Sequence, residues 1–210
     1  MTSRERPTAL LIDLDGVLRR FDPQVAADIE HRHGLAPGVL TRTVLDWSRL
    51  LPAVTGQVSH DEWLAGAARD LGGQTGEPTT ARAAVDEWGA YRGEVDPDVL
   101  TFVREVRAAG IPVGLATNAT DLLDTDLALL GLTDEIDLVV NSSVLGVHKP
   151  TKEYFHRACV ALDTPPSRVL LVDDSDRFVR GARVAGLVGY RWNGPDDLRY
   201  LRAVLGLVTN

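Results

Sequence analysis

Four short apolar runs recur along the chain, and each ends in polar residues. The runs are ALLID, IPVGLAT, DLVVNS and RVLLVD, which end at Asp13, at Thr117, near Ser142 and at Asp173. Their length and their β-branched residues are typical of parallel strands that are buried on both faces. A helical stretch follows each run, and a weaker run, LVGYRW, precedes a last helix. This alternation predicts an α/β fold with a Rossmann-like, doubly wound parallel sheet.

The interval between the first two runs is too long for a plain crossover. It extends over 104 positions, from Asp13 to Thr117, whereas a crossover connection needs only a few tens of residues. We therefore predict an insertion after the first strand. Residues 1–20 and 95–210 would form the α/β core, and residues 21–94 the insert. A chain of 210 residues has room for a core with a smaller insert, but not for two large domains.

Helix signals fill the insert and predict that it is a small α-helical cap. Asp22-Pro23 places a side-chain acceptor at a helix start and a proline in the first turn. Ser59 with Glu62 three positions later is a capping box, and Gly72 is the expected end of that helix. A third helix is expected over roughly 80–91.

Charge and hydropathy argue against two classes of partner. With 22 Lys and Arg against 30 Asp and Glu, the net charge of -8 repels polyanions, so we expect no nucleic-acid partner. Every apolar run falls short of the ~18 residues that cross a bilayer, so we expect no membrane partner. The start MTSRERPTALL lacks the apolar stretch of a secretory signal, and the single cysteine, Cys159, cannot form an intramolecular disulfide. Both features favour a cytoplasmic chain, and we expect Cys159 to be a buried, non-catalytic thiol.

The first run ends in two acids separated by one residue. Because residues two apart on an extended chain point the same way, Asp13 and Asp15 can reach one volume beyond the carboxyl end of the strand. Open α/β sheets place their ligands at that edge. Gly16 then allows a sharp departure of the backbone into the insert. Taken alone, the motif is equally typical of a turn with hydrogen-bonding side chains.

The other three runs also end in residues that suit a phosphate and a cation. Thr117 and Asn118 stand at a helix start, although this is also an ordinary cap. Lys149, fixed by the proline that follows it, would neutralise a nucleophile and a phosphoryl oxygen if it faced inward, although most lysines are solvated. Asp173 and Asp174 need a cation nearby unless they only decorate a helix start. Carboxylates without nearby His or Cys favour Mg²⁺.

These four signals stand at successive strand ends in the order acid pair, threonine, lysine, acid pair, which favours one functional site. With DLDGVL, ATN, the lysine of GVHKP and VDDS, the chain resembles the haloacid dehalogenase superfamily over nearly its whole length. The resemblance is strong in the core and only architectural in the insert. The place of the insert is similar to the helical cap of the dehalogenase, phosphoglycolate-phosphatase and epoxide-hydrolase-like phosphatase branch. Thr151-Lys152 departs from the acid and proline that the family more often has after its lysine.

The resemblance implies a hydrolase, specifically a phosphatase with two catalytic aspartates. Asp13 would attack phosphorus and form an aspartyl-phosphate, while Asp15 would protonate the leaving oxygen and later deprotonate the attacking water. Mg²⁺ would be held by Asp13, the backbone carbonyl of Asp15 and Asp174, with Asp173 as a direct or an indirect partner. Thr117, the Asn118 amide and Lys149 would hold the phosphoryl oxygens.

Three alternatives remain open from the sequence. A 2-haloacid dehalogenase uses the same nucleophile without a metal and has no use for Asp15 as an acid. A phosphomutase keeps both aspartates and transfers the phosphoryl group to a second hydroxyl. A non-catalytic scaffold on this fold would be expected to lack the nucleophile, the lysine or a metal-binding acid, and none is missing.

The substrate is expected to be a small phosphorylated metabolite, such as a sugar phosphate or phosphoglycolate. Its recognition should lie in the cap, which in this branch closes over the site. We interpret Arg19 and Arg20 as surface charges rather than as ligands of a second anionic group. Monomer and homodimer both remain open. The cap candidates, each more typical of packing than of substrate contact, are Arg42, Trp47, Arg49, Trp63 and Trp88.

Overall fold

A five-stranded parallel sheet forms the centre of the computed structural model, which describes residues 6–207. The strand order is β5-β4-β1-β6-β7. The first strand of the chain is therefore the middle strand, flanked by β4 and β6, and its carboxyl end has a neighbour on each side. This confirms the predicted α/β fold. The strands are β1 (Ala9–Ile12), β4 (Val113–Thr117), β5 (Leu138–Asn141), β6 (Val169–Asp173) and β7 (Val188–Arg191).

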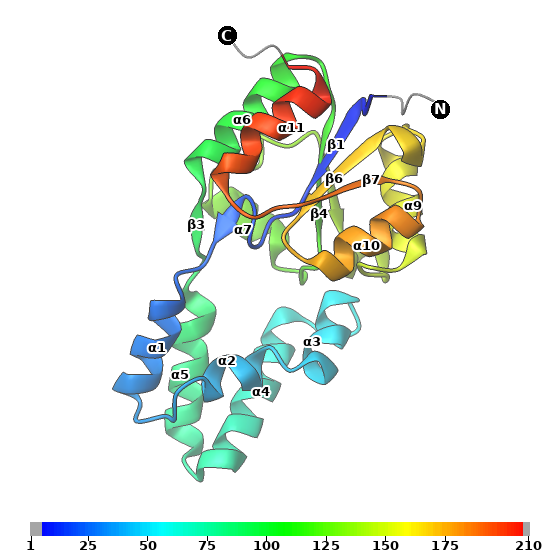
Figure 1. The fold of residues 1–210 in the computed structure, drawn as a ribbon. Helices are drawn as coiled ribbons and strands as arrows, with labels where there is room; N and C mark the ends of the chain where they lie inside the picture. The colour runs from blue at the N-terminus through cyan, green and yellow to red at the C-terminus, as the bar shows by residue number, and fades with distance from the viewer. Residues whose placement is uncertain (1–5, 208–210) are drawn as a thin grey trace.

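Helices cover both faces of the sheet, as a doubly wound sheet requires (Figure 1). Because side chains alternate along a strand, β1 sends Leu10 and Ile12 into one hydrophobic cluster and Ala9 and Leu11 into the other. Both clusters exclude water, which explains why the strands read as unbroken apolar runs. The first cluster includes residues of α6 (Pro97–Ala108), α7 (Leu123–Leu129) and α11 (Leu198–Leu205), and the second includes residues of α9 (Lys152–Ala161) and α10 (Asp176–Val184).

The single cysteine lies in α9, inside the second cluster, as a buried thiol. Burial raises the pKa of Cys159 to about 11, so almost none of it is thiolate at neutral pH. This environment agrees with the expectation of a non-catalytic cysteine.

Five helices between β2 and β3 form the insert, which has a hydrophobic cluster of its own. Figure 1 shows this group beyond one end of the sheet, with α4 and α5 packed side by side. The helices are α1 (Pro23–Arg32), α2 (Val39–Val44), α3 (Trp47–Val54), α4 (His60–Thr75) and α5 (Pro78–Ala90).

The helix signals of the insert were predicted correctly at the starts and wrongly at one end. The Asp22 carboxylate accepts from Gln24 N at 2.8 Å, and Ser59 forms the predicted capping box. The end of α4 differs, because the helix continues past Gly72 to Gly76, which takes a left-handed φ of 74°. Gly72 is needed for packing instead, since an added Cβ would lie 2.9 Å from the Cα of Pro78.

A short antiparallel ribbon joins the insert to the sheet, and it was not predicted. It consists of β2 (Arg19–Arg20) and β3 (Glu94–Val95). Asp96 N donates to Leu18 O at 2.9 Å and ties the two crossings together. The chain therefore enters and leaves the insert through one paired ribbon.

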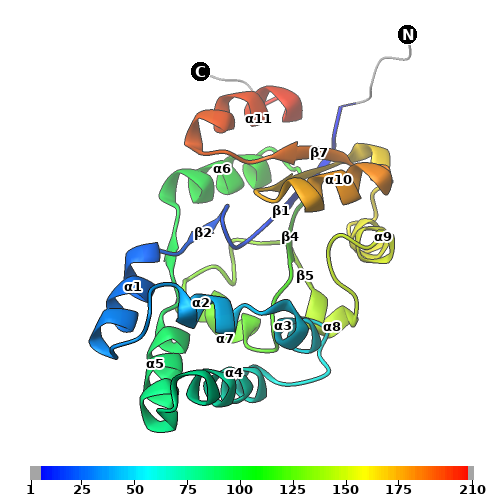
Figure 2. The ribbon, with the colours of Figure 1, turned by 60° about the horizontal axis from the view of Figure 1, so that its bottom comes forward.

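The insert touches the core again on the other side, near α8 (Ser142–Leu145), and Figure 2 shows α3 beside α8. His60 N donates to Asp121 at 2.8 Å, and the rings of Trp47 and His148 lie 5.3 Å apart. The two backbones also approach closely at Gly56, which has a φ of 71° and where an added Cβ would collide with the carbonyl oxygen of Ser143. Contacts on two sides thus hold the insert over the carboxyl ends of the strands.

We predict that Gly56→Ala prevents this second contact. The left-handed φ costs a non-glycine residue about 1–3 kcal/mol, and the added methyl group collides with backbone. We expect a lower melting temperature and a larger radius of gyration in small-angle X-ray scattering. Gly73→Ala is the matched control, because Gly73 is an exposed position of α4 with open space around it; it should raise stability by about 0.5–1 kcal/mol. Equal scattering and melting for Gly56→Ala and the unmodified protein would show that the contact is not a constraint.

Candidate active site

Asp13 leaves the middle strand at its carboxyl end and is buried. Its backbone N–H still donates to Val172 O of β6 at 3.0 Å, so the residue is held by the sheet. Its Oδ1 accepts from Leu14 N at 2.8 Å and from Lys149 Nζ at 2.9 Å. One carboxylate oxygen is thus fixed by two donors, and within residues 6–207 no donor contacts the other.

Lys149 is only 1% exposed and lies between two buried carboxylates. Its Nζ is 2.9 Å from Asp13 Oδ1 and 2.7 Å from Asp173 Oδ2, and 5.0 Å from the ring centre of Phe178. Burial lowers the pKa of Lys149, but Asp13 and Asp173 raise it, and the result lies above the ordinary value. The lysine is therefore charged and faces inward, which excludes the interpretation as a solvated side chain.

The side chain of Asn118 forms hydrogen bonds with both the backbone N–H and the backbone carbonyl of Lys149. Asn118 Nδ2 donates to Lys149 O at 3.1 Å, and Lys149 N donates to Asn118 Oδ1 at 2.8 Å. Both ends of the side-chain amide are thus engaged with Lys149, while the backbone N–H of Asn118 stands at the end of β4. Thr117, the last residue of β4, is buried beside it.

Three carboxylates meet in this region and could hold a metal ion. Asp13, Asp173 and Asp174 each offer an oxygen, and these oxygens lie within 4.8 Å of one another. Burial raises the pKa of Asp13 well above its ordinary value; Lys149 opposes this shift and Asp173 adds to it. Burial and then Asp173 also raise the pKa of Asp174. One ammonium cannot neutralise three carboxylates, so the donor set and the charge both fit a hard divalent cation.

The two acids that end β6 differ in what they have left to offer. Asp173 is fully buried, and its two oxygens accept from Lys149 Nζ at 2.7 Å and from Ser175 N at 2.9 Å. Asp174 is exposed and lies against Gly16, where an added Cβ would collide with its carboxylate. Gly16 also has a φ of 89°, so glycine is needed there for two reasons. Asp174 is the freer of the two acids.

Asp15 lies at the mouth of the site, with 44% of its side chain exposed. Its Oδ1 accepts from Arg19 Nε at 2.6 Å, and Arg19 Nη1 donates to Asp126 Oδ2 at 2.8 Å. The interpretation of Arg19 as a surface charge was wrong, because its side chain is 6% exposed and bridges two acids. Arg20 does lie at the surface, where it pairs with Asp96 at 3.2 Å.

Asp126 is a site neighbour that the sequence analysis missed. It lies in α7, among the apolar residues of LDTDLAL, and no motif or spacing distinguishes it. It is buried, and its second oxygen faces Arg92 at 3.5 Å. Only the fold brings it to Arg19, which lies 107 positions away in the chain.

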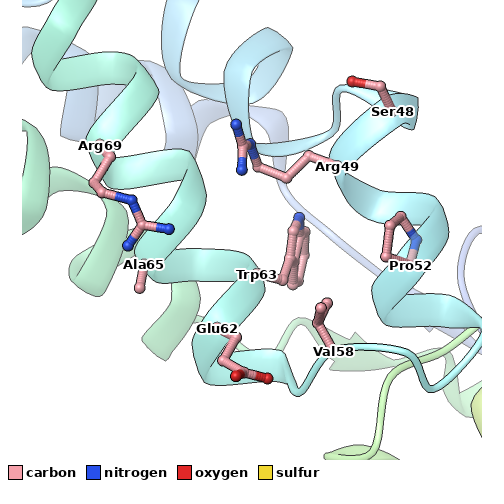
Figure 3. Close-up of a pocket in the computed structure, with 8 residues that line it drawn as sticks. All are labelled: Ser48, Arg49, Pro52, Val58, Glu62, Trp63, Ala65 and Arg69. Carbon is pink, nitrogen blue, oxygen red and sulfur yellow. The ribbon is translucent and has the colours of Figure 1, made fainter.

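Most of the cap candidates pack inside the insert. Trp63 donates its indole N–H to Val44 O at 3.0 Å and packs edge-to-face on Trp88. Arg49 pairs with Asp70. Arg49 and Trp63 also line a pocket between α3 and α4 (Figure 3), whose walls come from the insert alone. Trp47 is the exception, because its ring meets His148 next to Lys149.

No helix within residues 6–207 is both long enough and apolar enough to span a bilayer. This agrees with the apolar runs read from the sequence, none of which is long enough to cross.

Comparison with known proteins gives one consistent family. The ribulose-1,5-bisphosphate 5-phosphatase of Halopiger xanaduensis is 30% identical over 197 residues, 86% of this chain and 82% of that protein. A HAD family enzyme of Bacteroides thetaiotaomicron has the same fold, with a TM-score of 0.74 at 20% identity over 94% of this chain and 98% of that chain. L-2-haloacid dehalogenase of Xanthobacter autotrophicus is also similar in fold, with a TM-score of 0.63 at 24% identity over 88% and 77%.

The family model described as haloacid dehalogenase-like hydrolase matches residues 7–186, which include every predicted site residue. The match agrees with the resemblance read from the four strand-end motifs. The chain therefore belongs to the haloacid dehalogenase-like hydrolases.

Proposed function

We propose that this hydrolase is a Mg²⁺-dependent phosphatase that hydrolyses a small phosphomonoester through an aspartyl-phosphate on Asp13. The observation that carries the proposal is the buried contact of Asp13, Lys149 and Asp173 at the end of the middle strand. An acid at the mouth of the same site, Asp15, is available for proton transfer.

The first half of the reaction forms the phosphoryl-enzyme. A carboxylate oxygen of Asp13 attacks phosphorus in line, and the bond between phosphorus and the ester oxygen breaks. Asp15 gives its proton to that departing oxygen, so an alcohol leaves. Lys149, Thr117 and the backbone N–H of Asn118 would hold the phosphoryl oxygens as negative charge spreads over them.

The second half returns the enzyme to its starting state. Asp15, now a carboxylate, takes a proton from water, and the water oxygen attacks phosphorus. The bond between phosphorus and Asp13 breaks, which releases inorganic phosphate and restores both aspartates.

Asp13, Asp174 and the backbone carbonyl of Asp15 would hold the metal ion, with Asp173 steadying Lys149 behind them. When bound, Mg²⁺ offsets the repulsion between these carboxylates and a phosphate dianion. The related fold from Bacteroides thetaiotaomicron has been crystallised with magnesium and inorganic phosphate, which supports this choice of metal and ligand.

Two observations favour a phosphatase over the alternatives. A dehalogenase would have no use for Asp15 as an acid or for a third carboxylate beside Asp13 and Asp173. The relative that is 30% identical is named as a phosphatase of a sugar bisphosphate, which supports a small phosphorylated metabolite as substrate. Transfer to a second hydroxyl, as in a phosphomutase, would use the same two aspartates and is the second candidate.

We further propose that residues 21–94 act as the cap, with residues 1–20 and 95–210 as the catalytic core. The insert meets the core at the β2–β3 ribbon and at Gly56, on two sides of the strand ends. A substrate between the two parts would be shielded from water during transfer.

The first test is phosphate release from a panel of sugar phosphates, phosphoglycolate and other phosphomonoesters, with Mg²⁺ and with EDTA. We expect release that requires the metal and is lost in Asp13→Asn, which keeps the size of the side chain but removes the nucleophile. Thermal melting and Mg²⁺ titration should show that Asp13→Asn is folded and still binds the metal. Wild-type release from Asp13→Asn would refute the assignment of the nucleophile.

The second test replaces the buried lysine. Lys149→Met leaves Asp13 and Asp173 buried without a counter-ion, so we expect a loss of about 3–5 kcal/mol in unfolding free energy. We expect kcat/KM to fall by about 10³-fold, because a donor to the developing charge is lost, while calorimetry should show tighter Mg²⁺ binding to the more negative site.

The control is Lys152→Met, which removes an exposed lysine three positions away and should change neither stability nor activity. Weaker Mg²⁺ binding in Lys149→Met than in the unmodified protein would argue against the proposed charge balance of the site.

A further inference from the structure

Arg19 is a buried cation placed between a proposed catalytic residue and the core. It lies in β2, the strand through which the chain enters the insert, and it is buried. Its Nε donates to Asp15 at 2.6 Å and its Nη1 to Asp126 at 2.8 Å. A guanidinium forms such directed double contacts because its donors are fixed in one plane. Because Arg19 is buried and already contacts two carboxylates, we assign it no contact with a second anionic group of the substrate.

Asp126 ties this arrangement to the hydrophobic core. Its helix, α7, also supplies Leu123 and Leu127 to the hydrophobic cluster under the sheet. Arg92, in the segment before β3, faces the other oxygen of Asp126 at 3.5 Å. The anchor therefore contacts both crossings between the core and the insert.

Asp15 depends on Arg19 for its orientation. Its side chain is 44% exposed and, within residues 6–207, its single hydrogen bond is the one from Arg19. The backbone holds the two residues together, because Gly16 N donates to Arg19 O and Arg19 N to Leu14 O. Arg19 thus fixes Oδ1 of Asp15 and leaves Oδ2 for proton transfer.

We propose that Arg19 is a positioning residue, which ties the Asp15 carboxyl to Asp126 so that Asp15 can pass its proton to the leaving oxygen. The inference rests on the proposed phosphatase reaction. As the proton leaves Oδ2, negative charge develops on Asp15 beside the guanidinium, which stabilises it. In the second half-reaction the same contact holds the carboxylate toward the water that gives up its proton.

The leaving group separates this role from a merely structural one. Nitrophenolate departs without a proton, whereas an alkoxide needs one. The constant kcat/KM covers the steps up to formation of the aspartyl-phosphate, so it reports proton donation only for an alkyl ester. A loss of folded enzyme would lower kcat/KM by the same factor for both kinds of ester.

The test compares glycerol 2-phosphate with p-nitrophenyl phosphate in the full chain with Mg²⁺. Arg19→Lys keeps the charge but cannot span both acids, and we expect kcat/KM to fall about 10²-fold for the alkyl ester and at most about threefold for the nitrophenyl ester. Asp126→Asn, which keeps the shape of the anchor, should show the same selectivity to a smaller extent. Arg20→Lys, at the exposed neighbouring position, should match the unmodified protein for both esters.

Selective loss in either Arg19→Lys or Asp126→Asn supports the proposal, so a variant that fails to fold does not end the test. Equal losses for the two esters, or no loss in a folded Arg19→Lys, would overturn it. If the unmodified protein released phosphate from neither these esters nor the metabolite panel, the proposed function would fall, and this inference with it.

Discussion

The buried ammonium of Lys149 is the contact on which the arrangement of the strand ends depends. It lies 2.9 Å from Asp13 and 2.7 Å from Asp173, and all three side chains are buried. A buried charge without a partner is costly, so the three groups are stable only together. They come from the end of β1, the segment before α9 and the end of β6, while Asn118, after β4, clamps the backbone of the lysine. The Lys149 ammonium thereby joins the segment before α9 to the ends of β1 and β6.

A second constraint is the place of the insert, between the middle strand and its neighbour. Both crossings run through the β2–β3 ribbon, directly beyond Asp13 and Asp15. Arg19 in this ribbon contacts Asp15 on one side and Asp126 of α7 on the other. A movement of the insert about the ribbon would therefore displace Arg19 and change the orientation of Asp15, the proposed acid. Arg19 thus links the position of the insert to the position of the Asp15 carboxyl.

Local patterns were enough to predict the sheet, the starts of α1 and α4 and the set of residues at the strand ends. Strands that are buried on both faces appear in the sequence as apolar runs. Ser59 and Glu62 mark a helix start through contacts within one helical turn, which do not depend on the rest of the fold. Gly72 was misassigned because its role is set by contact with Pro78, on another helix. The short helix α2 was missed because it has no side-chain cap and packs through Leu40 and Val44 into the cluster of the insert. The start of α3 does carry a local signal, the Asp46 carboxylate that accepts from Ser48 N, and it was overlooked. Arg19 and Arg20 look alike in the sequence, and only the fold reveals that Arg19 is buried beside Asp126, 107 positions away from it.

Direct detection of the phosphoryl-enzyme tests the central claim. Asp15→Asn removes the base for the second half-reaction, and p-nitrophenyl phosphate needs no acid in the first, so this pair should let the intermediate accumulate. After acid quench and digestion, mass spectrometry should find one added phosphoryl group, labile to hydroxylamine, on the peptide that carries Asp13. Release of phosphate without any phosphorylated peptide, or a phosphoryl group on another residue, would contradict the account.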